Sequence, residues 1–181
     1  KNNLKIINSP HESEILSINA ENNGGVYLIP AFTGLGPPYW LPNAKASFFG
    51  INASTNKNHL VRASLESVAY QMVVYLEYLQ EKKNISPKKL SIDGGMVKNN
   101  FFIQILADLL NVEINIPYME EMSSYGALLF GMQKFNNINN FSDLSNFGIK
   151  NKNISPKKNY LISDSYHTWK EIIDKNFIKN Q

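Results

Sequence analysis

The chain has 181 residues, of which 43% are hydrophobic and 18% charged, so it can bury a core of ordinary size for one domain. Its net charge of +3, with acids and bases interspersed, excludes the strongly basic surface of a nucleic-acid binder. It has no cysteine, which excludes disulfides and thiol catalysis, and no apolar run approaches the roughly 20 residues of a membrane helix. No signal segment opens it, so we expect a cytoplasmic protein that binds neither nucleic acid nor membranes.

The first half of the chain contains short elements and one long helix. In chain order we predict a weak helix at 11–20, a strand at 26–29, a Gly- and Pro-rich loop at 33–40, a strand at 48–51 and a helix at 58–80. Apolar side chains recur around much of the circumference of the 58–80 helix. This pattern predicts that the helix is largely buried.

The second half alternates strands and helices. In chain order we predict a strand at 90–92, a tight turn at 93–95, a helix at 101–110, a strand at 112–116 and a helix at 123–135. This alternation favours an α/β layer structure. Residues 136–158 are rich in Asn, Lys and Ser and are expected to be extended or loop-like, and an amphipathic helix at 166–179 closes the chain.

The segment 90–100 contains the strongest candidate site. A buried strand runs into Gly94 and Gly95, which permit a positive φ and let a ligand approach the backbone closely. The helix that follows presents unpaired N–H groups and a partial positive charge, which suits a phosphate. Asn99 can cap this helix or hydrogen-bond to a nucleotide. From these residues alone a plain strand-to-helix turn capped by Asn99 is the favoured interpretation, because two glycines are a weak motif.

Four other groups of residues have both a functional and a structural interpretation. Phe32 and the aromatic residues of 37–40 could stack on a sugar, although a loop packed on the core is favoured. Residues 11–14 lack the second histidine of a zinc site, so a solvated surface is favoured. His59 opens a helix, where a cap or a surface position is favoured over catalysis. Glu66 lies in an apolar helix and is expected to be a buried structural carboxylate tied to a backbone donor rather than an acid or base.

Several motifs of the chain resemble those of the FGGY carbohydrate kinases. Residues 26–40, VYLIPAFTGLGPPYW, resemble the corresponding segment of the glycerol kinases within that family. Residues 46–66 fit the family's C-terminal signature, in which Gly50-Ile51 is followed after seven residues by His59-Leu60 and then by 63–66. The 93–95 turn with Asn99-Asn100 and the later Tyr125-Gly126-Ala127 also match. The likeness covers nearly the whole chain, and its motifs occur in the family's order.

This resemblance implies an α/β fold of the actin-like ATPase (ribonuclease H-like) class, with a sheet flanked by helices. Kinases of the family have two such domains with ATP in the cleft between them, and residues 1–181 resemble the C-terminal, nucleotide-binding one. Gly95 and Asn99 match residues that touch the adenine nucleotide, Gly94 is expected to shape the turn, and Asp93 to cap or orient it. No metal ligand is assigned, because Mg²⁺ in the family works chiefly with phosphates and with the other domain. We expect residues 136–181 to form a more loosely structured tail that ends in a helix.

The resemblance also implies an activity for the intact protein, the transfer of phosphate from ATP, with Mg²⁺, to a terminal hydroxyl of glycerol or a similar polyol. The family's catalytic aspartate lies upstream, so we assign no catalytic residue here and expect the isolated chain to be inactive. The implied partners are the N-terminal domain of the same kinase and, by analogy, further copies in a homo-oligomer. Two alternatives stay open: another FGGY kinase acting on a pentulose or gluconate, and a degraded nucleotide-binding half with a regulatory role.

The chain departs from the glycerol kinase pattern after Trp40. An acidic residue usually follows this tryptophan, and Ala-Arg-Gly follows a little later, whereas Leu41 and Ala44-Lys45-Ala46 stand here. Lysine cannot reproduce a bidentate arginine contact, so any contact made by that arginine would be weaker in this chain. Exposed apolar surface facing the absent domain is expected in the first helix-rich region and around Trp169 in the final helix.

Overall fold

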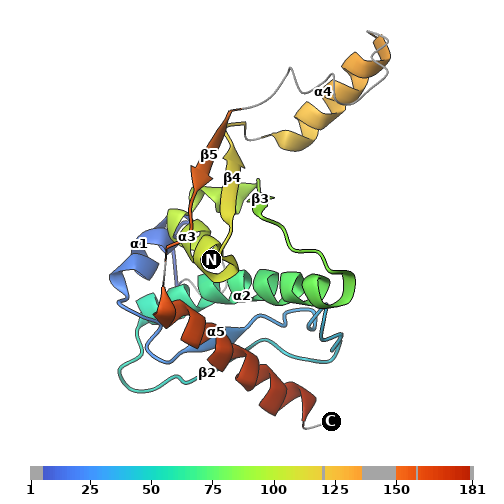
Figure 1. Ribbon diagram of the computed structural model, residues 1–181. Helices are drawn as coiled ribbons and strands as arrows, with labels where there is room; N and C mark the ends of the chain where they lie inside the picture. Colours follow the sequence, from blue (N-terminus) through green and yellow to red (C-terminus); the bar gives the residue numbers. More distant parts are fainter. Residues whose placement is uncertain (1–5, 120, 136–149, 158, 180–181) are drawn as a thin grey trace.

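The computed structural model describes residues 6–119, 121–135, 150–157 and 159–179. Figure 1 shows the long helix α2 across the middle of the molecule, with three strands on one side of it and β2 and α5 on the other. The elements are α1 Glu12–Asn19, β1 Tyr27–Ile29, β2 Ser47–Phe49, α2 Lys57–Lys83, β3 Lys89–Ser91, the 3₁₀ helix η1 Gly95–Lys98, α3 Asn100–Leu110, β4 Glu113–Pro117, α4 Met122–Phe135, β5 Asn151–Ile154, α5 Tyr160–Ile173 and the π-helical turn η3 Asp174–Ile178.

Helix α2 is slightly longer than the predicted 58–80, and its ends are capped by side chains and backbone. The Asn56 side chain accepts hydrogen bonds from the backbone N–H groups of Asn58 (2.9 Å) and His59 (3.3 Å), and the His59 Nδ1 accepts one from the Asn56 N–H (3.3 Å). Asn84 ends the helix in the left-handed conformation, with φ of 54°. The capping interpretation of His59 is therefore confirmed.

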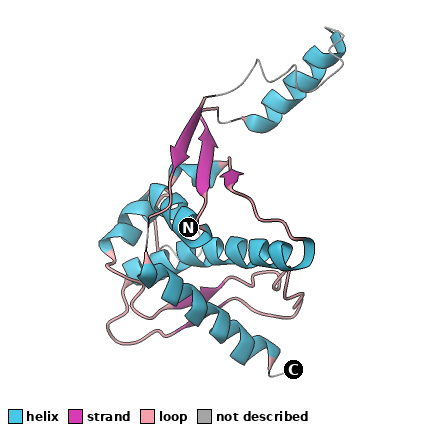
Figure 2. Cartoon of the chain, in the orientation of Figure 1, coloured by secondary structure: helices cyan, strands magenta, loops and turns pink. Residues whose placement is uncertain are grey.

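Within the described ranges, the strands form two separate sheets (Figure 2). Strands β1 and β2 pair antiparallel, with Leu28 opposite Phe48. The second sheet has the order β3-β4-β5, in which β3 and β4 are parallel and β4 and β5 antiparallel. Parallel strands need a crossover connection, and here the connection between β3 and β4 contains η1 and α3. The carboxyl ends of β3 and β4 therefore lie at the same edge of the sheet.

One hydrophobic core joins α2, α3, β1, β4 and α5. Trp169 of α5 is fully buried in it, and its indole Nε1 donates a hydrogen bond to the Leu28 carbonyl oxygen at 2.8 Å. The rings of Tyr70 and Tyr166 pack against this indole, with centroid distances of 5.6 and 6.5 Å. The exposed apolar surface expected on the final helix is present at Tyr160 and Leu161, which are 74% and 73% exposed, but not at Trp169. Its indole packs inward because β1 offers a carbonyl acceptor beneath it.

In the C-terminal part of the chain one helix differs from the prediction and one strand lies in a segment predicted as extended or loop-like. The final helix starts at Tyr160 rather than 166, because the Asn159 side chain caps it through the Ile162 N–H at 3.4 Å. Strand β5 lies within the segment expected to be extended or loop-like, where β4 supplies its partner. Residues 136–149 lie outside the described residues, so the loose tail expected at 136–181 stays a prediction.

The loop between β1 and β2 divides its large side chains between the core and the surface. Tyr39 and Leu41 pack against the core, and the backbones of Leu35 and Leu41 exchange two hydrogen bonds of 2.9 Å. Phe32 and Trp40, in contrast, are 77% and 69% exposed. The predicted packing of this loop is therefore right for Tyr39 and wrong for Phe32 and Trp40. The inward place of Leu41 also explains why an apolar residue suits that position.

Candidate functional site

The candidate site is the connection between β3 and α3. Strand β3 ends at Ser91, and the Ile92 N–H still donates to the Asn115 carbonyl of β4 at 3.0 Å. The chain then turns at Gly94, whose φ of 95° and ψ of −177° belong to a region that only glycine adopts readily. Gly95 begins η1, in which the Val97 N–H donates to the Gly94 carbonyl at 3.2 Å. The sequence thus forces a glycine turn at the carboxyl edge of the sheet.

Gly94 and Gly95 border open space. A Cβ placed on either glycine would meet no other heavy atom within 4 Å, and both residues are exposed. Beside them lies a hollow of about 640 Å³, between the ends of β3 and β4 and the start of α4. Its lining consists of the glycine turn, η1 and the segment after β4: Asp93, Gly94, Gly95, Val97, Lys98, Ile116, Pro117, Tyr118, Met119, Glu121, Met122 and Ser123. The turn therefore presents free backbone surface to a groove large enough for a small ligand.

Asn99 is the N-cap of α3, and both ends of its side-chain amide are occupied. Its Oδ1 accepts from the Phe102 N–H at 2.9 Å, and its Nδ2 donates to the Ser13 Oγ at 3.2 Å. The residue is only 9% exposed. The capping role weighed from the sequence is thus present in the structure. Asn99 also lines a second, smaller hollow of about 110 Å³ between α1 and η1, so it remains at the wall of the site.

Helix α1 lies directly against the site, which the sequence did not indicate. Glu14 accepts two hydrogen bonds from Asn100, one from its backbone N–H at 3.2 Å and one from its Nδ2 at 3.1 Å. Lys152 of β5 donates to the Asn100 Oδ1 at 2.9 Å from the other side. The interpretation of residues 11–14 as a solvated surface therefore misses Ser13 and Glu14. No sequence signal links these residues to Asn99 and Asn100, which lie 86 residues further on.

The site carries charges of both signs. The N-terminus of α3 has the partial positive charge of a helix start and Lys98 lines both hollows, while Glu14 lines the smaller hollow and Asp93 and Glu121 the larger one. Across the described ranges, no group of three or more His, Asp or Glu side chains is arranged to hold a metal ion. Within the same ranges, no helix has the length and hydrophobicity needed to span a bilayer. The start of α3 and the side chain of Lys98 are therefore the groups at this turn that suit a phosphate.

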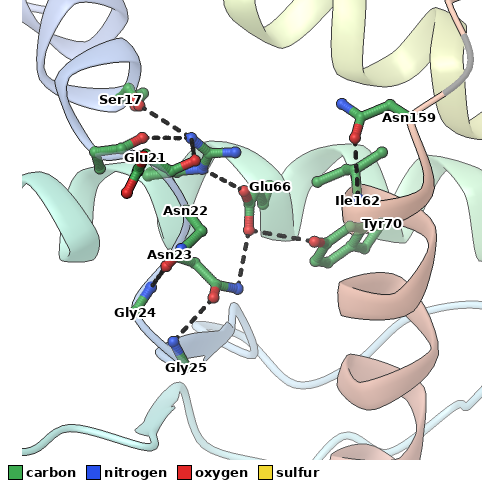
Figure 3. A network of polar contacts seen from close by, with 12 residues as sticks. Ser17, Glu21, Asn22, Asn23, Gly24, Gly25, Glu66, Tyr70, Asn159 and Ile162 are labelled. Carbon is green, nitrogen blue, oxygen red and sulfur yellow. Dashed lines mark hydrogen bonds and ion pairs between the residues drawn. The ribbon is translucent and has the colours of Figure 1, made fainter.

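Glu66 lies away from this groove, in a buried network between α2 and the turn at 22–25 (Figure 3). It is 2% exposed and is bound by the Arg62 Nε at 2.8 Å, the Tyr70 hydroxyl at 3.2 Å and the Asn23 Nδ2 at 3.2 Å. Burial raises the pKa of Glu66, and the hydrogen bond and charge of Arg62 offset part of that rise. The structural interpretation of Glu66 is confirmed. Its expected backbone donor is wrong, because three side chains supply the hydrogen bonds.

The comparison with known families decides what kind of domain this is. Residues 8–134 match the FGGY family of carbohydrate kinases, C-terminal domain. The chain belongs to this family. Glycerol kinases of Escherichia coli and Shigella boydii are 42% identical to it over 127 residues, which cover 70% of this chain and 25% of theirs. The chain of this FGGY member thus spans about a quarter of the length of the curated relatives it matches.

Solved structures of FGGY kinases share the fold. Plasmodium falciparum glycerol kinase with ADP superposes with a TM-score of 0.85 and 27% identity, over 96% of this chain and 35% of that one. Xylulose kinase of Lactobacillus acidophilus, described as ligand-bound, gives a TM-score of 0.79 at 20% identity, over 95% and 36% of the two chains. The predicted α/β class and actin-like fold are confirmed by these likenesses.

Proposed function

We propose that this FGGY chain is the nucleotide-holding C-terminal part of an ATP-dependent polyol kinase whose acceptor is glycerol. The observation that carries the proposal is the open glycine turn of Gly94 and Gly95 beside a groove at the carboxyl edge of β3 and β4. In open α/β sheets this edge is where ligands bind. Two likenesses support the choice of nucleotide and acceptor: the glycerol kinases that match at 42% identity, and the Plasmodium falciparum glycerol kinase, whose structure was solved with ADP.

The residues present fit an adenine nucleotide. We propose that the backbone of Gly94 and Gly95 lies against the nucleotide, because any larger side chain at these positions would occupy the same space. Asn99 caps the first turn of α3 and so fixes its direction relative to the glycine turn, while Glu14 accepts from the Asn100 N–H beside it. Lys98 adds a positive charge at the rim of both hollows. ATP, entering with Mg²⁺ bound to its phosphates, supplies the phosphoryl group that is transferred.

The proton acceptor for the glycerol hydroxyl is assigned to an N-terminal domain that is absent from these 181 residues. Phosphoryl transfer depends on holding the acceptor in line with the γ-phosphate, which one side of a cleft cannot do alone. We therefore propose that the isolated chain binds nucleotide weakly and has no turnover. We also propose that the full-length protein works in the cytoplasm as a homo-oligomer, which light scattering on the purified protein can test.

The test is nucleotide consumption by the full-length protein. ADP formation from ATP and Mg²⁺ should depend on glycerol and should be matched by formation of glycerol 3-phosphate. A folded sample that binds ADP yet shows no turnover with any acceptor would contradict the kinase proposal and favour a regulatory half. Robust turnover by the 181-residue chain alone would contradict the assignment of the proton acceptor to another domain.

A second acceptor class is tested in the same assay. Xylulose kinase and the gluconate kinase of Lactobacillus acidophilus have the same fold, with TM-scores of 0.79 and 0.74. Xylulose and gluconate should therefore be tested as acceptors in parallel with glycerol. A kcat/KM for either one that exceeds the value for glycerol would replace glycerol as the acceptor while leaving the nucleotide site unchanged.

A further inference from the structure

Arg62 is the only arginine of the chain, since the other positively charged side chains are all lysines. It projects from α2 and is 15% exposed. Its Nε donates to Glu66 at 2.8 Å, and its Nη1 donates to the carbonyl oxygens of Ala20 and Glu21, the latter at 3.2 Å. The Ser17 carbonyl oxygen lies 3.5 Å from the same Nη1, at the upper limit of hydrogen-bond distance. One guanidinium thus links the C-terminal end of α1 to α2. Figure 3 shows three residues of this network, Ser17, Glu21 and Glu66.

The same guanidinium also contacts the first turn of α3. Its central carbon lies 5.0 Å from the centre of the Phe101 ring, a cation–π geometry. Phe101 follows directly after Asn100 and after Asn99, which lines the smaller hollow of the candidate site. Arg62 therefore touches α1 and α3 at once, from a third helix.

Helix α1 is joined to the same turn of α3 at its other end. Ser13 accepts from the Asn99 side chain at 3.2 Å, and Glu14 accepts from Asn100 at 3.2 and 3.1 Å. The outer face of the helix leaves Ile15 and Ile18 63% and 58% exposed, while Ser17 and Ala20 are buried. A helix of eight residues is marginal by itself. The polar contacts at its two ends therefore contribute to the position of α1 against α3 and, with it, to the support of Asn99.

We propose that Arg62 is a positioning residue for the nucleotide site: by anchoring the end of α1 and the ring of Phe101, it keeps Ser13 and Glu14 against Asn99 and Asn100. This inference rests on the proposed function, since it takes that site to be the nucleotide site. The guanidinium suits the task because its planar fork donates in several directions at once. A lysine ammonium keeps the charge but cannot reach Glu66 and the α1 carbonyls in the same geometry.

The test uses Arg62→Lys in the full-length protein, with Tyr166→Phe as the matched control. Tyr166 donates to Glu77 at 2.7 Å, toward the other end of α2, so its variant loses a structural hydrogen bond without touching α1 or α3. For Arg62→Lys we expect the Kd for ADP, measured by calorimetry, to rise at least fivefold. The KM for ATP should rise with it, while the KM for glycerol and the kcat at saturating ATP stay within twofold. Tyr166→Phe should lower the melting temperature and leave the Kd for ADP unchanged.

The outcomes separate this inference from the function on which it rests. If the wild-type protein binds no ADP, the proposed function fails. If the wild type binds ADP and a folded Arg62→Lys protein binds it equally well, the positioning role fails alone. An equal rise of both KM values, or the same loss of ADP affinity in Tyr166→Phe, would reduce Arg62 to a general structural role and also overturn the inference.

Two milder variants keep the test decisive if Arg62→Lys does not fold. Phe101→Leu removes the aromatic face above Arg62, and Glu14→Gln weakens the contact of α1 with Asn100. Each should raise the Kd for ADP at least twofold and speed amide hydrogen exchange in α1, while exchange in α5 stays as in the wild type. Unchanged ADP binding in both variants would overturn the proposal.

Discussion

Gly50 directly follows strand β2 and Gly95 lies shortly after strand β3, and the two glycines differ in what surrounds them. At Gly50, with φ of 77°, a Cβ would lie 1.9 Å from the Gly25 carbonyl oxygen, because two backbone segments approach each other there. At Gly95 a Cβ would meet nothing within 4 Å. The first glycine is needed by the fold itself. The second leaves its backbone uncovered beside the larger hollow, where a ligand can approach it closely.

The largest effect is expected from Gly50→Ala. The new methyl group must displace the Gly25 backbone and also adopt a positive φ, so we expect a loss of about 4 kcal/mol or more in the free energy of unfolding. Denaturant unfolding measures it. Gly25→Ala is the matched control, because its φ is 74° but its Cβ has free space, and it should lose only about 1–2 kcal/mol. An equal loss of unfolding free energy in the two variants would show that the close approach of the Gly25 backbone does not add to the cost at Gly50.

The next effect concerns binding rather than folding. Gly95→Val adds a side chain in open space, so the free energy of unfolding should change by less than about 1 kcal/mol. The Kd for ADP should rise at least about tenfold, equivalent to about 1.4 kcal/mol, because the side chain fills the place of the nucleotide. Calorimetric titration of the full-length protein checks this. Wild-type affinity in the valine variant would show that the nucleotide does not lie against Gly95.

A smaller effect is expected at the cap of α3. Asn99→Ala removes the acceptor for the Phe102 N–H, and loss of such a cap typically lowers the free energy of unfolding by about 1 kcal/mol. Asn99→Asp keeps an acceptor at the helix start and should lie within about 0.5 kcal/mol of the wild type. Thermal unfolding of the three proteins compares them. A loss in the Asp variant as large as in the Ala variant would show that the bond to Ser13, and not the cap, stabilises the turn.

The smallest effect is a dependence of stability on pH, which comes from Glu66 in its buried network with Arg62, Tyr70 and Asn23. Burial raises the pKa of Glu66, so the folded protein holds this proton more tightly than the unfolded chain. Its contribution to stability is fully present below the ordinary glutamate pKa and is lost as pH rises through the raised value. The difference in unfolding free energy between wild type and Glu66→Gln should fall over that pH range. A difference that grows with pH would mean that Arg62 outweighs burial.

Local sequence patterns predicted the elements whose signals lie within a few residues. The spacing of apolar residues gave α2 and α3, and Asn99 at the start of α3 was recognised as a cap because the capping bond spans three residues. The glycine turn was located for the same reason. The contacts of Ser13 and Glu14 with this turn were not predictable, because they join residues 86 apart through the packing of α1 on α2 and α3.

Aromatic residues show the same division. The helical pattern of 166–179 located Trp169 on an amphipathic helix, but it did not say which partner the indole would meet. The Leu28 carbonyl lies 141 residues away and becomes its acceptor only when α5 packs on β1. Phe32 and Trp40 stand out from their loop while Tyr39 packs inward, although all three are aromatic. Burial of such residues depends on the backbone path, which no single residue type encodes.

By itself the sequence determined the order of the helices and strands other than β5 and η1, the place of the glycine turn and membership of the FGGY family, because each depends on residues close together or on motifs kept in order. The tertiary structure alone decided that the turn is open, that α1 supports it and that Arg62 joins three helices. These properties arise from distances between segments far apart in the chain. They exist only once hydrophobic burial has brought those segments together.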